Sequence, residues 1–252
     1  MSFHQNSARR KALSDFPPSL AEFYLERLSR RVKQSTDLKI ASTALSWVLS
    51  CTRPLKLVEL FFATSIDTEE EIWSEDQLFD DPESIVDICG GLITIREAEE
   101  RDVYPVLFCH PSVADFLNCQ FLPNGSTNPY FVEAQERDKR ILKGCLIYLK
   151  SRLLAHGPIE SPDDMEQRTF DDPFFSGATS EWAYHFCPGM EKEEDLQSLI
   201  QFALRSENGK YFASSQADMV VKVGDASLRR YIPNADPEVL EPVEKESRSF
   251  GI

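Results

Sequence analysis

The chain has 252 residues, of which 42% are hydrophobic and 27% charged, and its formal net charge is −15. This composition is typical of a globular protein and not of a disordered or collagen-like one. The acidic balance argues against a generally basic nucleic-acid-binding protein. No run of about 18 apolar residues occurs, so we expect no membrane span. The first residues lack the apolar core of a secretory signal, and we therefore expect a cytoplasmic protein.

The first segment, residues 1–36, carries a net charge of +4 and predicts one helix. Ser19 is a preferred N-cap residue, and Glu22 three residues later completes a capping box. Apolar residues then recur at helical spacing as far as Leu28. We interpret this segment as an N-terminal linker helix.

Residues 37–121 carry a net charge of −12 and predict three helices, a β-hairpin and a fourth helix. The third helix is expected to begin with Asp81 as its cap and to end at Gly90. Pro105 places the second strand at a sheet edge. The expected helices are 39–51, 58–63, 81–90 and 112–117, and the expected strands are 92–96 and 103–109. Three helices followed by a two-stranded wing are the winged-helix pattern, so we predict a mainly α protein with a winged-helix domain at 37–121.

Residues 67–81 contain eight acidic residues and no basic residue. Such a segment repels itself and is typical of a solvated loop. Acidic segments that include aromatic residues also dock onto basic, apolar grooves. Trp73, Leu78 and Phe79 are therefore candidate partner-docking residues, and both interpretations stay open.

The remaining sequence predicts a helical extension. Residues 122–133, rich in Pro, Gly and Asn, predict a linker or a long surface loop. Periodic apolar residues predict helices over 134–154, 174–186 and 193–205, within an extension that covers 134–232. Residues 233–252 are rich in Pro and Glu and are predicted to be disordered.

No catalytic motif is found. The phosphate loop, the serine motif of lipases and the HExxH zinc motif are all absent. The four histidines are far apart and the six cysteines form no CxxC pair, so we predict no metal site and interpret the cysteines as reduced thiols. We predict no catalytic residue and no cofactor; the alternative is an enzyme whose site this reasoning does not recognise.

Binding to DNA is the other alternative that a winged helix raises. The predicted third helix, which would enter the major groove, carries Asp81, Glu83 and Asp87 and no basic residue. Phosphate groups would repel this helix. We therefore expect no binding to DNA.

Several short patterns, in a fixed order between residues 9 and 187, resemble the region after the ATPase core of fungal NACHT-type STAND NTPases. They are Lys11-Ala12-Leu13, Arg53-Pro54-Leu55, Asp87-Ile88-Cys89-Gly90-Gly91, His110-Pro111-Ser112, Cys145-Leu146-Ile147-Tyr148-Leu149 and Trp182-Ala183-Tyr184-His185. Part of this region is similar to the winged-helix domain catalogued under GPI inositol-deacylase, a label that implies no lipase activity here.

The resemblance implies a non-catalytic module that takes part in signal transduction. In that family a NACHT module hydrolyses a nucleoside triphosphate, the winged helix relays its state by protein–protein packing, and downstream ankyrin or WD40 repeats sense the trigger. This chain has neither phosphate loop nor repeats, so it resembles a fragment or a stand-alone remnant, and hydrolysis is not carried over. The implied partners are a NACHT ATPase module, in cis or in trans, and other proteins; self-association stays open.

One residue is singled out by the resemblance. His110 lies between the wing and the following helix, where related signalling ATPases place a histidine that contacts the bound diphosphate. Imidazole suits this role because it donates to phosphate and titrates near neutral pH. Pro111 departs from the acidic residue that often follows that histidine. The alternative is a structural histidine with no nucleotide contact.

Overall fold

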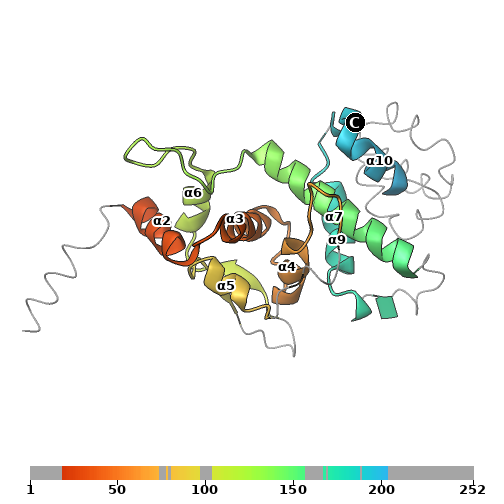
Figure 1. The fold of residues 1–252 in the computed structure, drawn as a ribbon, viewed down its shortest axis with the longest axis horizontal. Helices are drawn as coiled ribbons and strands as arrows, with labels where there is room; N and C mark the ends of the chain where they lie inside the picture. The colour runs from red at the N-terminus through yellow and green to blue at the C-terminus, as the bar shows by residue number, and fades with distance from the viewer. Residues whose placement is uncertain are drawn as a thin grey trace, which may run out of the picture. The chain divides into compact units, whose positions relative to one another are not determined.

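The computed structural model describes residues 19–73, 78, 81–96, 104–156, 167–168, 170–187 and 189–203. Within these ranges the chain is mainly helical with one two-stranded sheet, and the predicted order of three helices, hairpin and helix is confirmed (Figure 1). None of the helices described is both long and apolar enough to span a membrane. The chain divides into two compact units. Unit 1 comprises Met1–Leu49 and Glu83–Glu133, and unit 2 comprises Ser50–Pro82 and Ala134–Ile252.

The first helices described in unit 1 are α2 (Leu20–Arg31) and α3 (Ser35–Ser50). Ser19 caps α2 as predicted, because its Oγ accepts a hydrogen bond from the backbone N of Glu22 at 3.2 Å. Helix α3 starts earlier than the predicted residue 39. The reason is Asp37, whose Oδ2 accepts from the backbone N of Lys33 at 2.9 Å and of Gln34 at 3.1 Å and so caps the helix from within its first turn.

Helix α5 (Ser84–Ile88) corrects the prediction for the third helix. It begins after Glu83, not at Asp81, and it makes only five residues. Its end is as predicted: Gly90 and Gly91 adopt φ of +63° and +73°, which favour glycine. The third helix is therefore shorter than the predicted helix over residues 81–90 and makes little more than one turn.

The predicted hairpin is present as strands β1 (Ile93–Ile95) and β2 (Val106–Phe108). They pair antiparallel with Ile93 opposite Phe108 and Ile95 opposite Val106. The backbone N of Arg96 donates to the carbonyl of Pro105 at 3.0 Å, so Pro105 takes part through its carbonyl alone.

Helix α6 (Ser112–Asn118) follows the hairpin and is continued by an ordered loop in the predicted linker. Asn128 is buried in this loop, and its Nδ2 donates to the carbonyls of Phe116 at 2.8 Å and Cys119 at 3.1 Å. These hydrogen bonds satisfy carbonyl groups at the C-terminal end of α6 and hold the loop against the helix.

Unit 2 begins with the turn before helix α4 (Leu57–Thr64). The carboxylate of Glu59 is buried and accepts from Arg53 Nη1 at 2.8 Å, Arg53 Nη2 at 2.6 Å and the backbone N of Lys56 at 2.8 Å. The hydrogen bonds to Glu59 raise the pKa of Arg53. This paired charge fixes the turn and the start of α4.

The rest of unit 2 is built on helix α7 (Ala134–His156), along which α9 (Phe175–Tyr184) and α10 (Glu194–Ala203) pack (Figure 1). The 3₁₀ helix η2 (Met190–Lys192) joins α9 to α10. The core of unit 2 is aromatic: Tyr148 on α7 meets Phe174 with ring centroids 5.1 Å apart, and Trp182 is fully buried. The predicted helices of the extension are thus confirmed as far as residue 203.

Several predictions lie outside the described residues. They concern Phe79, most of the acidic segment after Trp73, the turn at 97–102, and residues 204–252. The domain boundaries proposed from the sequence stay predictions.

Candidate functional site

His110 lies where the sequence places it, between β2 and α6, and its side chain is exposed. Its Nδ1 accepts from the backbone N of Ser112 at 3.2 Å and lies 2.6 Å from the Ser112 hydroxyl. That hydroxyl lies 2.6 Å from the hydroxyl of Tyr24 on α2. Because Nδ1 accepts a backbone hydrogen, the neutral ring carries its proton on Nε2. His110 therefore keeps a donor at Nε2.

The short third helix presents acidic side chains. Asp81, Glu83 and Asp87 are all exposed, and residues 81–91 contain no Lys or Arg. A winged helix that binds DNA needs base-edge and phosphate contacts from this element, which requires basic or neutral polar side chains. The surface here has the opposite charge and suits a basic protein partner.

Trp73 does not lie on the surface. Its side chain is 7% exposed, its ring stacks on Phe62 with centroids 5.8 Å apart, and its Nε1 donates to Ser65 Oγ at 3.0 Å. Leu78 is half-buried, and Phe79 lies outside the described residues. The burial of Trp73 supports the packing interpretation, and the docking role of these three residues stays a prediction.

Unit 1 also carries an open apolar groove of about 390 Å³ between α2, α6 and the loop after α6. Leu20 and Phe121, which line it, are 55% and 60% exposed. Most other lining side chains are apolar, with Ser112 and Asp115 as polar exceptions. Apolar side chains gathered in an open groove are typical of a surface that packs against another protein.

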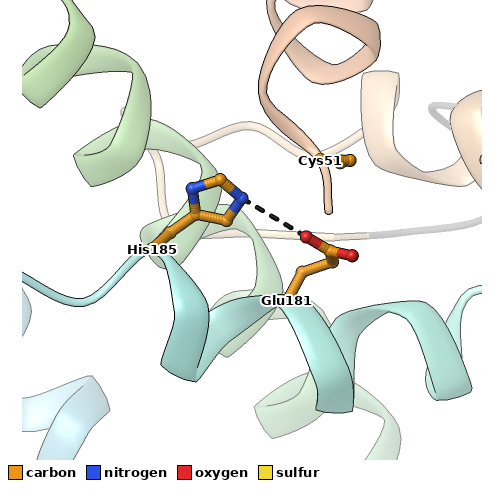
Figure 2. Close-up of side chains that lie close together, drawn as sticks. All are labelled: Cys51, Glu181 and His185. Carbon is orange, nitrogen blue, oxygen red and sulfur yellow. Dashed lines mark ion pairs between the residues drawn. The ribbon is translucent and has the colours of Figure 1, made fainter. Parts of the chain in front are cut away.

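A cluster of three side chains in unit 2 was not predicted. Cys51 follows the last residue of α3, while Glu181 lies on α9 and His185 at its C-cap, one turn later (Figure 2). One ligand-type atom of each residue lies within 4.8 Å of the others. His185 Nε2 is 3.4 Å from Glu181 Oε2. The side chains of Glu181 and His185 are 0% and 1% exposed.

Neighbouring groups hold this cluster, which we call the Cys51–Glu181–His185 cluster. Glu181 Oε2 accepts from the backbone N of Thr52 at 3.0 Å, and Oε1 accepts from the Thr52 hydroxyl at 2.6 Å. His185 Nδ1 lies 2.8 Å from Asp138 Oδ1 on α7. Thr52 thus fixes the Glu181 carboxylate, and Asp138 fixes the His185 ring from the side that faces away from Glu181.

The electrostatics of the cluster favour one charged carboxylate. Burial raises the pKa of Glu181, but the contacts with His185 and the two bonds from Thr52 outweigh burial, so the net effect lowers this pKa. Burial, with a smaller effect of the Glu181 charge, raises the pKa of the Cys51 thiol. Glu181 is therefore an anion in the protein interior beside a protonated thiol.

Sequence reasoning missed this cluster because it searched for ligands close together along the chain. Glu181 and His185 do have a helical i, i+4 spacing within a helix that the sequence predicts, and this was the available signal. Cys51 is brought to them only by the packing of the turn before α4 against α9. Of the other five cysteines, Cys89 and Cys145 are buried, Cys187 is partly buried, and Cys109 and Cys119 are exposed.

Residues 28–125 match the family model described as GPI inositol-deacylase, winged helix domain. The match covers α3, α4, α5, the hairpin and α6, the elements that make the winged-helix order. Comparisons with curated proteins and with solved structures found no significant match. The chain therefore contains a winged-helix domain, followed by a helical extension.

Proposed function

We propose that the chain is a non-catalytic regulatory module that acts by packing against another protein. The observation that carries this proposal is a set of exposed acidic side chains at the third helix of a winged-helix domain: Asp87 within the helix, Glu83 at its N-cap and Asp81 just before it. A domain of this type that carries acids where a DNA reader carries bases is suited to protein contacts instead.

The finer form of the proposal names the partner as a NACHT ATPase module, present in cis in a longer protein or supplied in trans. The resemblance of the short sequence patterns to fungal STAND NTPases supports this partner, a fungal source and a cytoplasmic location. In this proposal the winged helix packs on the ATPase and relays its nucleotide state, and this chain performs no catalysis.

His110 supports the relay because of its position and protonation. It is exposed, and Ser112 holds its Nδ1 as an acceptor, so that Nε2 carries the hydrogen. An N–H of this kind can donate to a phosphate oxygen that an ATPase module presents. We propose that His110 contacts the bound diphosphate in the resting state.

The test measures binding of the full chain to a purified NACHT ATPase module taken from a protein with the same type of winged-helix domain. The module is loaded with ADP or with a non-hydrolysable ATP analogue, and affinity is measured by biolayer interferometry at increasing salt. We expect tighter binding to the ADP form and weaker binding at high salt, since surface charge is screened. The variant D81K/E83K/D87K should lose at least about tenfold in affinity, which corresponds to about 1.4 kcal/mol.

Two further variants make the result specific. Glu133→Lys reverses an exposed acid elsewhere on unit 1 and should leave the affinity close to that of the parent. His110→Leu should remove the preference for the ADP form and leave the remaining affinity in place. The proposal would be refuted if the chain bound neither form of the module. It would also be refuted if the affinity changed neither with salt nor in the variant D81K/E83K/D87K.

A further inference from the structure

The Cys51–Glu181–His185 cluster has the composition of a metal site, and we propose that it binds one divalent transition-metal ion, with zinc the best match. The proposal does not depend on the proposed regulatory function. It rests on four observations: the distance between two ligand atoms, the orientation of the imidazole, the balance of charge and the type of ligand.

The distance between the two buried ligands fits a tetrahedral ion. Zinc–nitrogen and zinc–oxygen bonds of about 2.0–2.1 Å place two ligand atoms about 3.3 Å apart at a tetrahedral angle. His185 Nε2 and Glu181 Oε2 are 3.4 Å apart. These two side chains therefore already stand at the separation that zinc requires.

The imidazole is oriented as a ligand. His185 Nδ1 lies 2.8 Å from the Asp138 carboxylate. When an ion is bound, Nδ1 would donate its hydrogen to Asp138 and leave the Nε2 lone pair for the ion. In a side chain only 1% exposed, Nε2 makes no hydrogen bond within the part of the chain that the structure describes. It faces Glu181 across the cluster (Figure 2). A carboxylate behind a histidine is the usual support of a zinc-bound imidazole.

The charges balance when an ion is bound. Glu181 contributes one negative charge, and Cys51 contributes a second when the ion displaces its thiol hydrogen as a proton that passes to solvent. Together they neutralise a divalent cation in an interior where unpaired charge is costly. One thiolate, one imidazole and one carboxylate suit zinc or cobalt(II) rather than magnesium or calcium, which prefer oxygen ligands alone.

Cys51 must move to complete the site. A zinc–sulfur bond of about 2.3 Å requires the sulfur about 3.6 Å from the other ligands. The sulfur now lies within 4.8 Å of the other two ligand atoms, so each of these distances must shorten by no more than about 1.2 Å. Cys51 follows α3 in irregular backbone, which allows such a shift through rotation of its side chain. A water molecule completes the tetrahedron, and the ion ties the turn before α4 to α9.

The test uses the full chain, purified with a non-thiol reductant, stripped with a chelator and titrated with zinc or cobalt(II). We expect one equivalent of zinc by elemental analysis and displacement of a chromophoric chelator. We also expect a sulfur-to-cobalt charge-transfer band together with visible bands of a tetrahedral cobalt ion. Zinc should raise the melting temperature, because it binds the folded state.

Matched variants assign the site. Cys51→Ser should remove the charge-transfer band, and His185→Gln should abolish stoichiometric binding. Asp138→Asn should weaken zinc binding by roughly 10–100-fold, the usual effect of losing the group behind a metal-bound histidine. Cys119→Ser and His110→Gln change an exposed cysteine and an exposed histidine outside the cluster and should bind as the parent does.

The outcome is decisive even if one variant folds poorly. Circular dichroism of each metal-free variant identifies loss of fold, and Cys51, which is only partly buried, supplies a variant that should keep its structure. The proposal would be overturned if the protein did not compete with the chelator for zinc. It would also be overturned if the cobalt spectrum were the same in Cys51→Ser and in the parent.

Discussion

Trp73 illustrates how a single aromatic residue joins separate parts of unit 2. Besides its contact with Phe62, its ring meets Tyr148 of α7 edge-on with centroids 5.0 Å apart. The guanidinium carbon of Arg152 lies 5.0 Å from the Trp73 ring centroid, a cation–π contact. The acidic segment 67–81 thus contains a tryptophan that belongs to the core.

We expect Trp73→Ala to lower the free energy of unfolding by about 3–5 kcal/mol, because it removes a large buried ring and leaves a cavity. The adjacent variant Ile72→Ala is the control, since Ile72 is 51% exposed and its loss should change stability by less than about 0.5 kcal/mol. Urea denaturation followed by tryptophan fluorescence of the remaining residues and by circular dichroism measures both. A Trp73→Ala chain that keeps its stability but loses a partner would restore the docking hypothesis.

At the scale of elements, α2 is fixed to the turn that ends α5. Arg27 Nε donates to the carbonyl of Gly90 at 2.8 Å, and a Cβ at Gly90 would lie 2.9 Å from the carbonyl oxygen of Arg27. Tyr24 and Leu28 are buried on the same helix. The backbone of α2 and the turn approach so closely that only glycine fits at residue 90.

Gly90→Ala should therefore destabilise the protein by about 2–4 kcal/mol, from left-handed strain together with a backbone clash. Gly125→Ala is a matched control: φ there is +84°, yet nothing lies within 4 Å of an added Cβ. The control should lose only the strain, about 1–2 kcal/mol. Thermal and chemical unfolding of both variants tests the difference, and equal losses would show that the close approach is unimportant.

Helix α10 is joined to α7 by charged side chains. Asp195 Oδ1 is 3.3 Å from Lys139 Nζ, and its Oδ2 is 3.4 Å from Lys143 Nζ. Lys139 also pairs with Glu193, just before α10. Burial raises the pKa of Asp195, but the two lysines outweigh it and lower the net pKa from its ordinary value of 3.8.

A carboxyl group whose pKa is lower in the folded state stabilises the protein above its unfolded pKa, and this stability is lost as pH falls through the folded pKa. We expect Asp195→Asn to cost about 0.2–1 kcal/mol near pH 7, the range of partly exposed ion pairs, and the cost to disappear on acidification below pH 3.8. Urea unfolding between pH 7 and 3 tests this, with Glu194→Gln as the exposed neighbour. A difference that grows as the pH falls would contradict the assignment.

The sequence predicts most elements because their signals are local. Helical periodicity gives α2, α3, α7, α9 and α10, and the pair of glycines before Leu92 marks the start of the wing. The predicted start of the third helix was wrong. An Asp before a Pro fits a turn as well as a helix cap, and here the turn continues to Glu83. The burial of Trp73 and the approach of Cys51 to His185 depend on contacts across long stretches of chain, for which one sequence holds no pattern.

For the molecule as a whole, charge is the dominant property. The net charge is −15, and the segment 37–121, which lies wholly within the match to the winged-helix model, accounts for −12 of it. Counterion release, the main source of non-specific affinity for DNA, requires basic side chains along the contact surface. We expect no DNA binding for this reason rather than for lack of the fold.

In an electrophoretic mobility-shift assay at low salt, the chain should not retard duplex DNA. The variant D81K/E83K/D87K replaces three exposed acids with bases and should gain weak, salt-sensitive retardation. Because both proteins have the same fold, the comparison measures the effect of surface charge alone on DNA binding. Retardation by the unaltered chain that persists at physiological salt would contradict the prediction.

The attachment of α2 has a practical consequence for anyone who expresses this protein in pieces. The family match starts at residue 28, within α2, and a fragment trimmed there would lack Tyr24 and Arg27. The ring of Phe116, which Tyr24 covers with centroids 5.7 Å apart, would then meet water, and the Gly90 carbonyl would lose its guanidinium donor. Such a fragment should be prone to aggregate, so recombinant versions of the domain need to begin upstream of Ser19 to stay soluble.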